Sequence, residues 1–185
     1  MTGWMGLGLG VVGLVLAAGG LTIVGGRRWD REVHALRVRL VTGRAQVPSS
    51  ASAPPARYDA RELDGLPAPV QRYFRAVLRD GQPLITGATI TMAGSFNLSA
   101  TGEQWRPFTS RQQVVTRRPG FVWDARIALA PGVSVRVVDS YVAGQGLLQA
   151  MAQGLFTVAR QQGEGEIARG EFMRWFAEVL WYPTA

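Results

Sequence analysis

The stretch FVWDARIALAPGVSVRVVDSYV, from Phe121 to Val142, decides the fold because it predicts two adjacent strands. β-Branched and aromatic residues are typical of strands, and Pro131 followed by Gly132 supplies a turn signal between them. We therefore expect Phe121–Leu129 and Val133–Val142 to form an antiparallel hairpin.

Segments of similar composition lie on both sides of this hairpin. Further strands are expected near Leu84–Met92, Ser95–Ser99 and Gln112–Arg117. The stretch Leu147–Arg160 fits a helix and an alternating strand equally well, so both assignments stay open.

Two amphipathic segments enclose the predicted strands. Apolar residues of helical period predict one helix between Leu66 and Asp80 and another from Gly170 to about Tyr182. The buried stripe of the second helix is expected to be Phe172, Trp175, Phe176 and Val179. This order of elements predicts an α+β fold, with a curved antiparallel sheet (an incomplete barrel) packed with helices.

The N-terminal segment has the composition of a membrane span. Trp4 to Val24 contains no charged residue, and about 20 apolar residues in a helix cross a bilayer. A cleaved signal peptide is the alternative, but no basic residue precedes the apolar run. We expect a single transmembrane anchor over residues 1–26, a basic juxtamembrane helix over 27–44, a Pro/Ser/Ala linker over 45–58 and an α+β domain over 59–185.

The charge of +7 is concentrated next to the predicted anchor. The segment from Arg27 to Arg57 carries a large share of it, whereas arginines and acids nearly balance after Tyr58. Arginines beside a span favour a cytoplasmic C-terminal domain at a bacterial cell membrane and attract anionic lipids, so membrane lipids are the expected partners. This distribution argues against nucleic-acid binding, and no protein partner is indicated.

Neither a cofactor site nor a metal site is predicted. The chain has no cysteine and one histidine, which removes thiolate chemistry and the usual zinc ligands. Phosphate-binding loops, nucleophile elbows and zinc-protease motifs are missing from the sequence as well.

Two groups of residues are candidates for a ligand cavity. The first lies on the predicted hairpin: Trp123, Asp124, Arg126, Asp139 and Tyr141. Asp124 and Arg126 share one strand face, with Trp123 on the other, and Arg126 and Asp139 are expected to form a cross-strand ion pair or to line a cavity. The second group lies on the last helix: Glu171, Arg174, Trp175 and Glu178. Its charged members fit a surface ion-pair ladder, or a carboxylate pair lining a cleft.

Several strings resemble a bacterial, membrane-associated family known only as a domain of unknown function. They are RYFRAVLRDGQP (72–83), GSFN (94–97), WRPF (105–108), PGFVWDARI (119–127), the run from Val135 through Gly146, and GEFMRWFAEVLWYPTA (170–185). The resemblance covers nearly all of Leu66 to Ala185 and implies an α+β domain with no assigned reaction. In that family the last motif usually continues as WYPTALLP before further strands, so the domain is expected to be incomplete at its C-terminus.

The layout also resembles, more weakly, the bacterial lipoprotein carriers of the LolA and LolB type. Arg118-Pro119-Gly120-Phe121 with Trp123 is the matching piece. This resemblance implies an incomplete barrel with an apolar concavity closed by a helix.

Three functions from different classes are compatible with these features. A binding module for a lipid or other apolar small molecule near the membrane predicts a continuous apolar cavity. A hydrolase-type enzyme predicts two carboxylates that converge and have perturbed pKa values. A scaffold or assembly protein predicts a filled interior and an exposed aromatic patch.

Overall fold

The computed structural model describes residues 2–45, 56–116 and 118–184; within the first helix, the side chains of 2–12, 14, 15 and 43–45 are not described. In chain order the helical elements before the sheet are α1 (Thr2–Ala45), the 3-10 helix η1 (Ala60–Leu63) and α2 (Ala68–Val77). The strands are β1 (Gly87–Asn97), β2 (Trp105–Val115), β3 (Gly120–Ala130), β4 (Val133–Val142), β5 (Gln145–Ala152) and β6 (Phe156–Gly163). The helices α3 (Glu166–Glu178) and η2 (Val179–Trp181) complete the fold.

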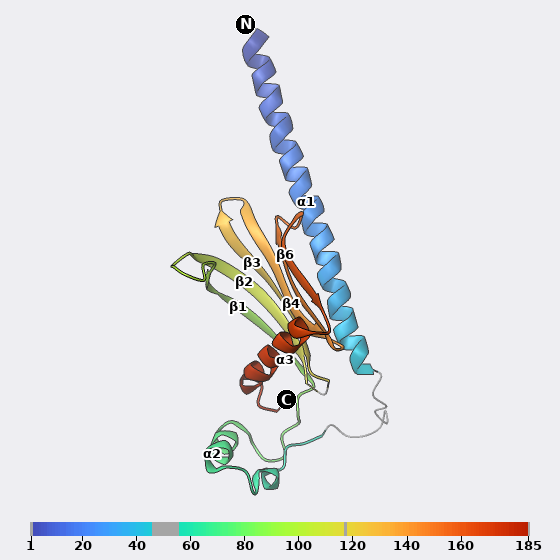
Figure 1. The fold of residues 1–185 in the computed structure, drawn as a ribbon, viewed down its shortest axis with the longest axis vertical. Helices are drawn as coiled ribbons and strands as arrows, with labels where there is room; N and C mark the ends of the chain where they lie inside the picture. Colours follow the sequence, from blue (N-terminus) through green and yellow to red (C-terminus); the bar gives the residue numbers. More distant parts are fainter. Residues whose placement is uncertain (1, 46–55, 117, 185) are drawn as a thin grey trace.

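The strands form one antiparallel sheet in sequential order, with β1 and β6 at its edges (Figure 1). Each strand pairs with the next, so the described sheet is an open meander and does not close. The predicted α+β class and the predicted hairpin at Pro131-Gly132 are confirmed by β3 and β4.

Other strand predictions need correction. The two segments predicted near Leu84–Met92 and Ser95–Ser99 are one strand, β1, and the segment predicted to start at Gln112 is the second half of β2. Leu147–Arg160 contains two strands, because Gln153 and Gly154 adopt φ values of +53° and +69° and turn the chain back on itself. Consecutive positive φ values are typical of tight hairpin turns and end any helix.

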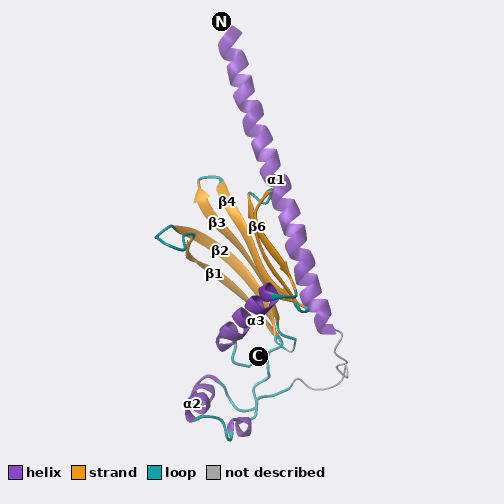
Figure 2. Ribbon diagram, in the orientation of Figure 1, coloured by secondary structure: helices purple, strands orange, loops and turns teal. Residues whose placement is uncertain are grey.

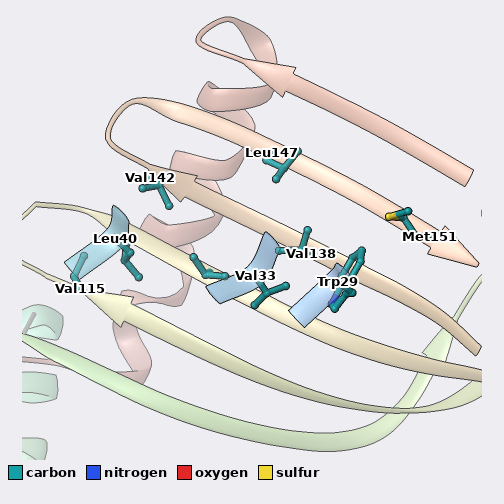
Figure 3. Close-up of a cluster of buried hydrophobic side chains, with 9 residues drawn as sticks. Trp29, Val33, Leu40, Val115, Val138, Val142, Leu147 and Met151 are labelled. Carbon is teal, nitrogen blue, oxygen red and sulfur yellow. The ribbon is translucent and has the colours of Figure 1, made fainter. Parts of the chain in front are cut away.

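Two helices cover opposite faces of the sheet (Figure 2). The C-terminal half of α1 lies along one face, where Trp29, Val33 and Leu40 are buried against strand residues that include Val122 and Val138 (Figure 3). Their spacing places the three helix residues on one side of α1. The segment that the sequence assigns to a juxtamembrane helix therefore contributes to the core of the domain.

The backbone of α1 comes close to the β5–β6 turn at a pair of glycines. A Cβ atom on Gly25 would lie 2.4 Å from the carbonyl oxygen of Gln153, and one on Gly154 would lie 2.6 Å from the carbonyl oxygen of Gly25. Backbone meets backbone here, so a side chain at either position would push the helix off the β5–β6 turn.

α3 packs on the other face by a different stripe from the predicted one. Phe172 and Phe176 are 37% and 61% exposed, and the buried residues are Ala168, Glu171 and Trp175. The prediction is confirmed for Trp175 and wrong for Phe172 and Phe176, because hydrophobicity alone does not set the rotation of this helix. Gly146 of β5 admits the backbone of α3 at Ala168, and polar residues of the sheet pair with the charged side of the helix.

The residues before the sheet lie beyond one end of it and contact the C-terminal segment (Figure 1). Tyr58, Leu63 and Leu78 form a small apolar cluster, and Tyr73 Oη donates to the Leu180 carbonyl oxygen at 2.7 Å. The predicted linker, residues 45–58, therefore ends in folded structure at Tyr58, while residues 46–55 lie outside the described part.

Within the described part of the chain, no helix is both long and apolar enough to cross a membrane. The predicted anchor includes residues 1–12, 14 and 15, whose side chains lie outside that part.

Candidate functional site

The predicted site residues divide between the two faces of the sheet. Asp124 and Arg126 lie on the α1 face, where the indole nitrogen of Trp29 donates to Asp124 Oδ1 at 2.8 Å. The α3 side of the sheet carries the others: Trp123, Asp139, Tyr141, Glu171, Arg174, Trp175 and Glu178. The predicted alternation of Trp123 against Asp124 and Arg126 is confirmed.

The predicted ion pair between Arg126 and Asp139 does not form. Asp139 lies opposite Trp123 in the sheet register, whereas Arg126 lies opposite Arg136. Arg126 Nε instead donates to the Ser134 hydroxyl at 3.2 Å. Because directly opposed residues of antiparallel strands share a face, Arg126 and Asp139 point to opposite sides of the sheet.

On the α3 side, Arg174 is the centre of a charged cluster. Its Nη1 donates to Asp139 Oδ2 at 2.6 Å and its Nε donates to Glu178 Oε1 at 3.0 Å. Its guanidinium also lies over the rings of Phe121 and Trp123, at 4.9 and 5.1 Å from their centroids. Charge-assisted hydrogen bonds and cation–π contacts of this kind hold an arginine in a fixed position.

Two carboxyl groups of this cluster have raised pKa values. Burial raises the pKa of Glu171 to about 7, and the nearby Asp139 carboxylate adds to the shift against the opposing effect of Arg174. Burial also raises the pKa of Asp139, although Arg174 pulls it down. Desolvation disfavours a charged carboxylate, so Glu171 is partly protonated at neutral pH.

The cluster also contains hydrogen-bond acceptors that are not satisfied. Gln112 Nε2 donates to Glu178 Oε2 at 2.5 Å. Gln112 Oε1, Asp139 Oδ1 and Glu171 Oε2 are buried and have no hydrogen-bond partner among the described residues. We call Gln112, Asp139, Glu171, Arg174 and Glu178 the Arg174 cluster. A protonated carboxyl beside ionised ones can donate and accept protons near neutral pH.

The aromatic candidates support this cluster by packing. Phe172 contacts the ring of Tyr141 at a centroid distance of 5.4 Å and stacks on Trp175 at 6.2 Å. Trp175 Nε1 donates to the Val115 carbonyl oxygen at 3.2 Å, so Trp175 holds α3 onto the sheet.

The α1 face has a pocket that the sequence analysis did not identify. It has a volume of about 330 Å³ and lies between α1 and the strands β4–β6. Its apolar lining residues are Trp29, Val33, Ala35, Leu36, Val138 and Leu147, and its polar ones are Glu32, Arg39, Gln149, Arg160 and Gln162. We call it the α1 pocket.

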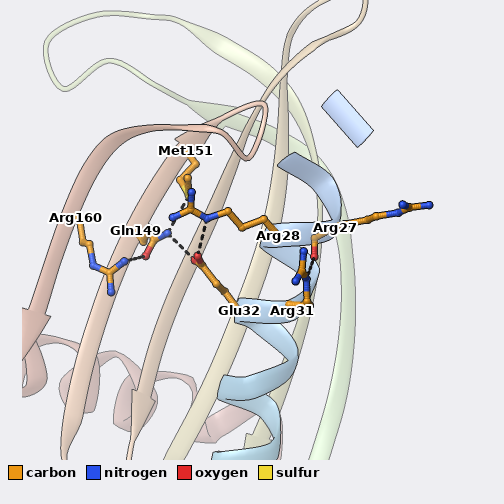
Figure 4. A network of polar contacts seen from close by, with 7 residues as sticks. All are labelled: Arg27, Arg28, Arg31, Glu32, Gln149, Met151 and Arg160. Atoms are coloured by element: carbon orange, nitrogen blue, oxygen red, sulfur yellow. Dashed lines mark hydrogen bonds and ion pairs between the residues drawn. The ribbon is translucent and has the colours of Figure 1, made fainter. Parts of the chain in front are cut away.

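Hydrogen bonds organise the polar side of the α1 pocket (Figure 4). Gln149 Nε2 donates to Glu32 Oε2 at 3.1 Å, and Arg160 Nη1 donates to Gln149 Oε1 at 2.6 Å. Arg28 Nε donates to the other oxygen of Glu32 at 3.3 Å. The signal for this pocket was present in the apolar period of Val33, Leu36 and Leu40, within the segment predicted to be a juxtamembrane helix.

A second hollow on the α1 face is rich in arginine. Arg126 and Arg136 line two adjoining spaces of about 320 and 240 Å³, and Arg111 lines the larger one. The smaller space reaches α1 at Thr22, Ile23 and Gly26. We call the hollow around Arg111, Arg126 and Arg136 the arginine pocket.

Neither face presents an evident metal site. Among the residues that the structure describes, no three side chains of the histidine, cysteine, aspartate or glutamate type are grouped to hold a metal ion.

Comparison with known families gives one result. The model of a family of unknown function, DUF6920, matches residues 64–185, which include α2, the sheet and α3. No curated protein and no solved structure matches the chain. The resemblance to lipoprotein carriers therefore stays a prediction.

Proposed function

This chain belongs to the family of unknown function DUF6920, and for it we propose a binding role: the α1 pocket holds an amphiphilic ligand, such as a lipid, beside a membrane. The observation that carries the proposal is the pocket itself. One side is apolar and the other presents fixed polar groups, which is the usual composition of a small-molecule site.

The size and lining of the α1 pocket suit part of an amphiphile. A volume of about 330 Å³ lies at the lower end of the range for ligand sites. Val33, Leu36 and Leu147 would contact an apolar chain, while Arg39 and Arg160 would face an acidic head group. A ligand wholly buried in so small a space would have to be short, so a longer chain would extend along α1.

The membrane part of the proposal rests on the sequence of α1. Trp4 to Val24 carries no charge and would form a single-pass anchor, followed by the basic residues Arg27, Arg28 and Arg31 on what would be the cytoplasmic side of a bacterial membrane. α1 is continuous through this junction. Ala35 would then lie about 16 Å along the helix from the end of the span, at 1.5 Å per residue. A lipid leaving the bilayer would reach the pocket along the same helix.

Binding of a fluorescent fatty acid to the purified full chain tests this proposal. Ala35 is exposed and lines the pocket, so Ala35→Trp should fill the pocket and weaken binding by at least about ten-fold, the effect of losing ~1.4 kcal/mol of contact. Val38→Trp, at an exposed position of α1 outside the pocket lining, is the matched control and should bind like wild type. Equal affinity of all three proteins, or no binding by wild type, would remove the proposal.

The Arg174 cluster supports a second candidate function, a hydrolase-type enzyme. Two carboxyl groups with raised pKa values lie beside one arginine, and carboxyl groups with pKa values near neutral pH are suited to acid–base catalysis. Protonated Glu171 would donate a proton to a leaving group, and ionised Asp139 would activate a water molecule.

Hydrolysis of chromogenic esters and glycosides between pH 5 and 9 tests the second candidate. Activity should change around pH 7 in wild type, and Glu171→Gln should abolish it, whereas Glu103→Gln at an exposed loop position should have no effect. Absence of hydrolysis in wild type would refute this candidate for the substrates tested.

A further inference from the structure

The sheet has one end at which three hairpin turns gather. The β1–β2, β3–β4 and β5–β6 turns lie at the same end because the strands alternate in direction, and this end points toward the N-terminal half of α1 (Figure 1). Two of these turns lie next to α1, and one of them contacts it. Gly132 and Gln153 line a space with Thr22, Ile23 and Gly26 of α1, and Gly154 touches Gly25. The β3–β4 and β5–β6 turns therefore lie level with the residues at which the uncharged segment Trp4–Val24 stops, while the β1–β2 turn lies farther from α1 (Figure 1).

Large apolar side chains are exposed near all three turns. Their exposed fractions lie between 39% and 70%, and they are Phe96, Leu98, Trp105, Val133, Phe156 and Val158. The β4–β5 turn at the opposite end consists of Ala143 and Gly144, although α3 and η2 also expose Met173, Phe176, Leu180 and Trp181. Exposed apolar groups gathered at one place mark a contact surface, and aromatic residues are favoured where protein meets the head-group region of a bilayer.

The arginine pocket lies beside this end and has an excess of positive charge. Arg126 and Arg136 face each other directly across β3 and β4, where like charges repel. Arg136 pairs at 3.5 Å with Asp30, whose side chain is 68% exposed, and such an exposed pair is weak. The carboxylate of Asp124 is already bound by Trp29 and Arg37.

The chemistry of this pocket fits a phosphate group. Two guanidinium groups held opposite each other present several N–H donors to one anion, and phosphate accepts such donors in pairs. Thr91 and Thr109 add hydroxyl groups to the lining. A bound phosphate would relieve the repulsion between Arg126 and Arg136, which the exposed Asp30–Arg136 pair offsets only weakly.

We propose that the hairpin end of the sheet rests on an anionic lipid surface, with its aromatic and apolar residues in the head-group region and a lipid phosphate in the arginine pocket. This inference rests on the membrane location in the proposed function, because α1 would bring the hairpin end to the bilayer surface. It also assigns Arg126 and Arg136 to lipid head groups instead of the α1 pocket ligand.

Single-cysteine labelling tests the contact, since the chain has no cysteine of its own. The full chain would be reconstituted in nanodiscs of phosphatidylcholine mixed with phosphatidylglycerol, with an environment-sensitive fluorophore at one position per protein. Labels at Leu98→Cys and Phe156→Cys should report an apolar environment, and a label at Ala143→Cys, at the opposite end, should report water. A label at Gly13→Cys reports separately on the anchor, and a Cβ there meets nothing within 4 Å.

The arginines are tested in the same nanodiscs. Arg126→Gln with Arg136→Gln should lower the ratio of docked to undocked chains by about 30-fold, the effect of removing two charges near an anionic surface. Arg75→Gln with Arg79→Gln, one in α2 and one just after it and both exposed, is the matched control and should leave the ratio unchanged. In phosphatidylcholine alone, docking of wild type should weaken.

Each contrary outcome has a distinct meaning. If the Gly13 label lies in the bilayer while the Leu98 and Phe156 labels stay in water, the docking surface is refuted and the anchor stands. If the Gly13 label also lies in water, the membrane location fails, and the docking surface fails with it. The last outcome is that inorganic phosphate binds wild type and not the Arg126/Arg136 variant, while the labels at Leu98→Cys and Phe156→Cys stay in water. The arginine pocket then takes free phosphate, and its assignment to a lipid phosphate is refuted.

Discussion

Replacement of Glu171 by glutamine should stabilise the protein at high pH and leave it unchanged at low pH. The Glu171 side chain is 8% exposed, and its pKa rises from 4.5 to about 7 in the folded chain. The folded state therefore binds a proton more tightly than the unfolded state does. Between pH 4.5 and 7, the native protein loses stability as pH rises, because the carboxyl group must either stay protonated or ionise in a buried position.

The size of this effect follows from the shift in pKa. Each pKa unit corresponds to about 1.4 kcal/mol, so the shift alone amounts to about 3 kcal/mol above pH 7. The Arg174 side chain beside Glu171 is 28% exposed, so solvent screening reduces the expected value to about 2 kcal/mol. Glutamine has nearly the same shape and does not ionise. Glu171→Gln should therefore gain about 2 kcal/mol over wild type at pH 8.5 and nearly nothing at pH 4.5.

Thermal unfolding of the full chain in mild detergent, followed by tryptophan fluorescence at several pH values, measures this difference. Glu62→Gln, at an exposed carboxylate of η1, is the control and should show no such dependence on pH. The assignment of a protonated buried Glu171 would be refuted if the Glu171→Gln variant were less stable than wild type at pH 8.5. It would also be refuted if the melting temperatures of variant and wild type differed by the same amount at pH 4.5 and pH 8.5.

Three further substitutions have expected outcomes in the same unfolding assay. Trp29→Phe removes the donor to Asp124 and replaces a fully buried indole by a smaller ring, so it should cost at least about 2 kcal/mol, the value of a hydrogen bond to a charged group, plus the cost of the cavity; an unchanged melting temperature would contradict this packing and this bond. Arg174→Met leaves two carboxylates without their cation and should cost about 3 to 5 kcal/mol at neutral pH, with a smaller loss at pH 4. Gly25→Ala should cost about 1 to 3 kcal/mol through overpacking, whereas Gly26→Ala, where a Cβ meets nothing, should gain up to about 1 kcal/mol from helix propensity.

The strand hairpin was predictable because its signals are local. Alternating apolar residues and the Pro131-Gly132 turn lie within one short stretch, and they determine both strands and the face of Trp123. The turn at Gln153-Gly154 was not predictable in the same way. Glutamine is not a usual residue at a positive φ, and the apolar spacing around it matches helix and strand alike.

The site residues were predicted in part, for a related reason. Residue type and period indicated Glu171, Arg174 and Glu178 as one side of a helix, but their burial depends on Gly146, which lies far away in the sequence. The cross-strand partner of Asp139 required the register of β3 against β4, and a one-residue shift changes every partner. The α1 pocket required the packing of a helix that the sequence analysis treated as outside the domain.

The packing of α1 on the sheet means that its attachment does not depend on a continuous chain. Trp29, Val33 and Leu40 are almost fully buried in the core, and burying a side chain of this kind contributes about 2 kcal/mol. A protease cut within residues 46–55 would break the covalent connection and leave those contacts in place. Two polypeptides, residues 1–45 and 56–185, should consequently reassemble when expressed together, as complementary fragments of one core. In the intact chain, the segment between the two fragments then serves only to raise the effective concentration of α1 near the sheet.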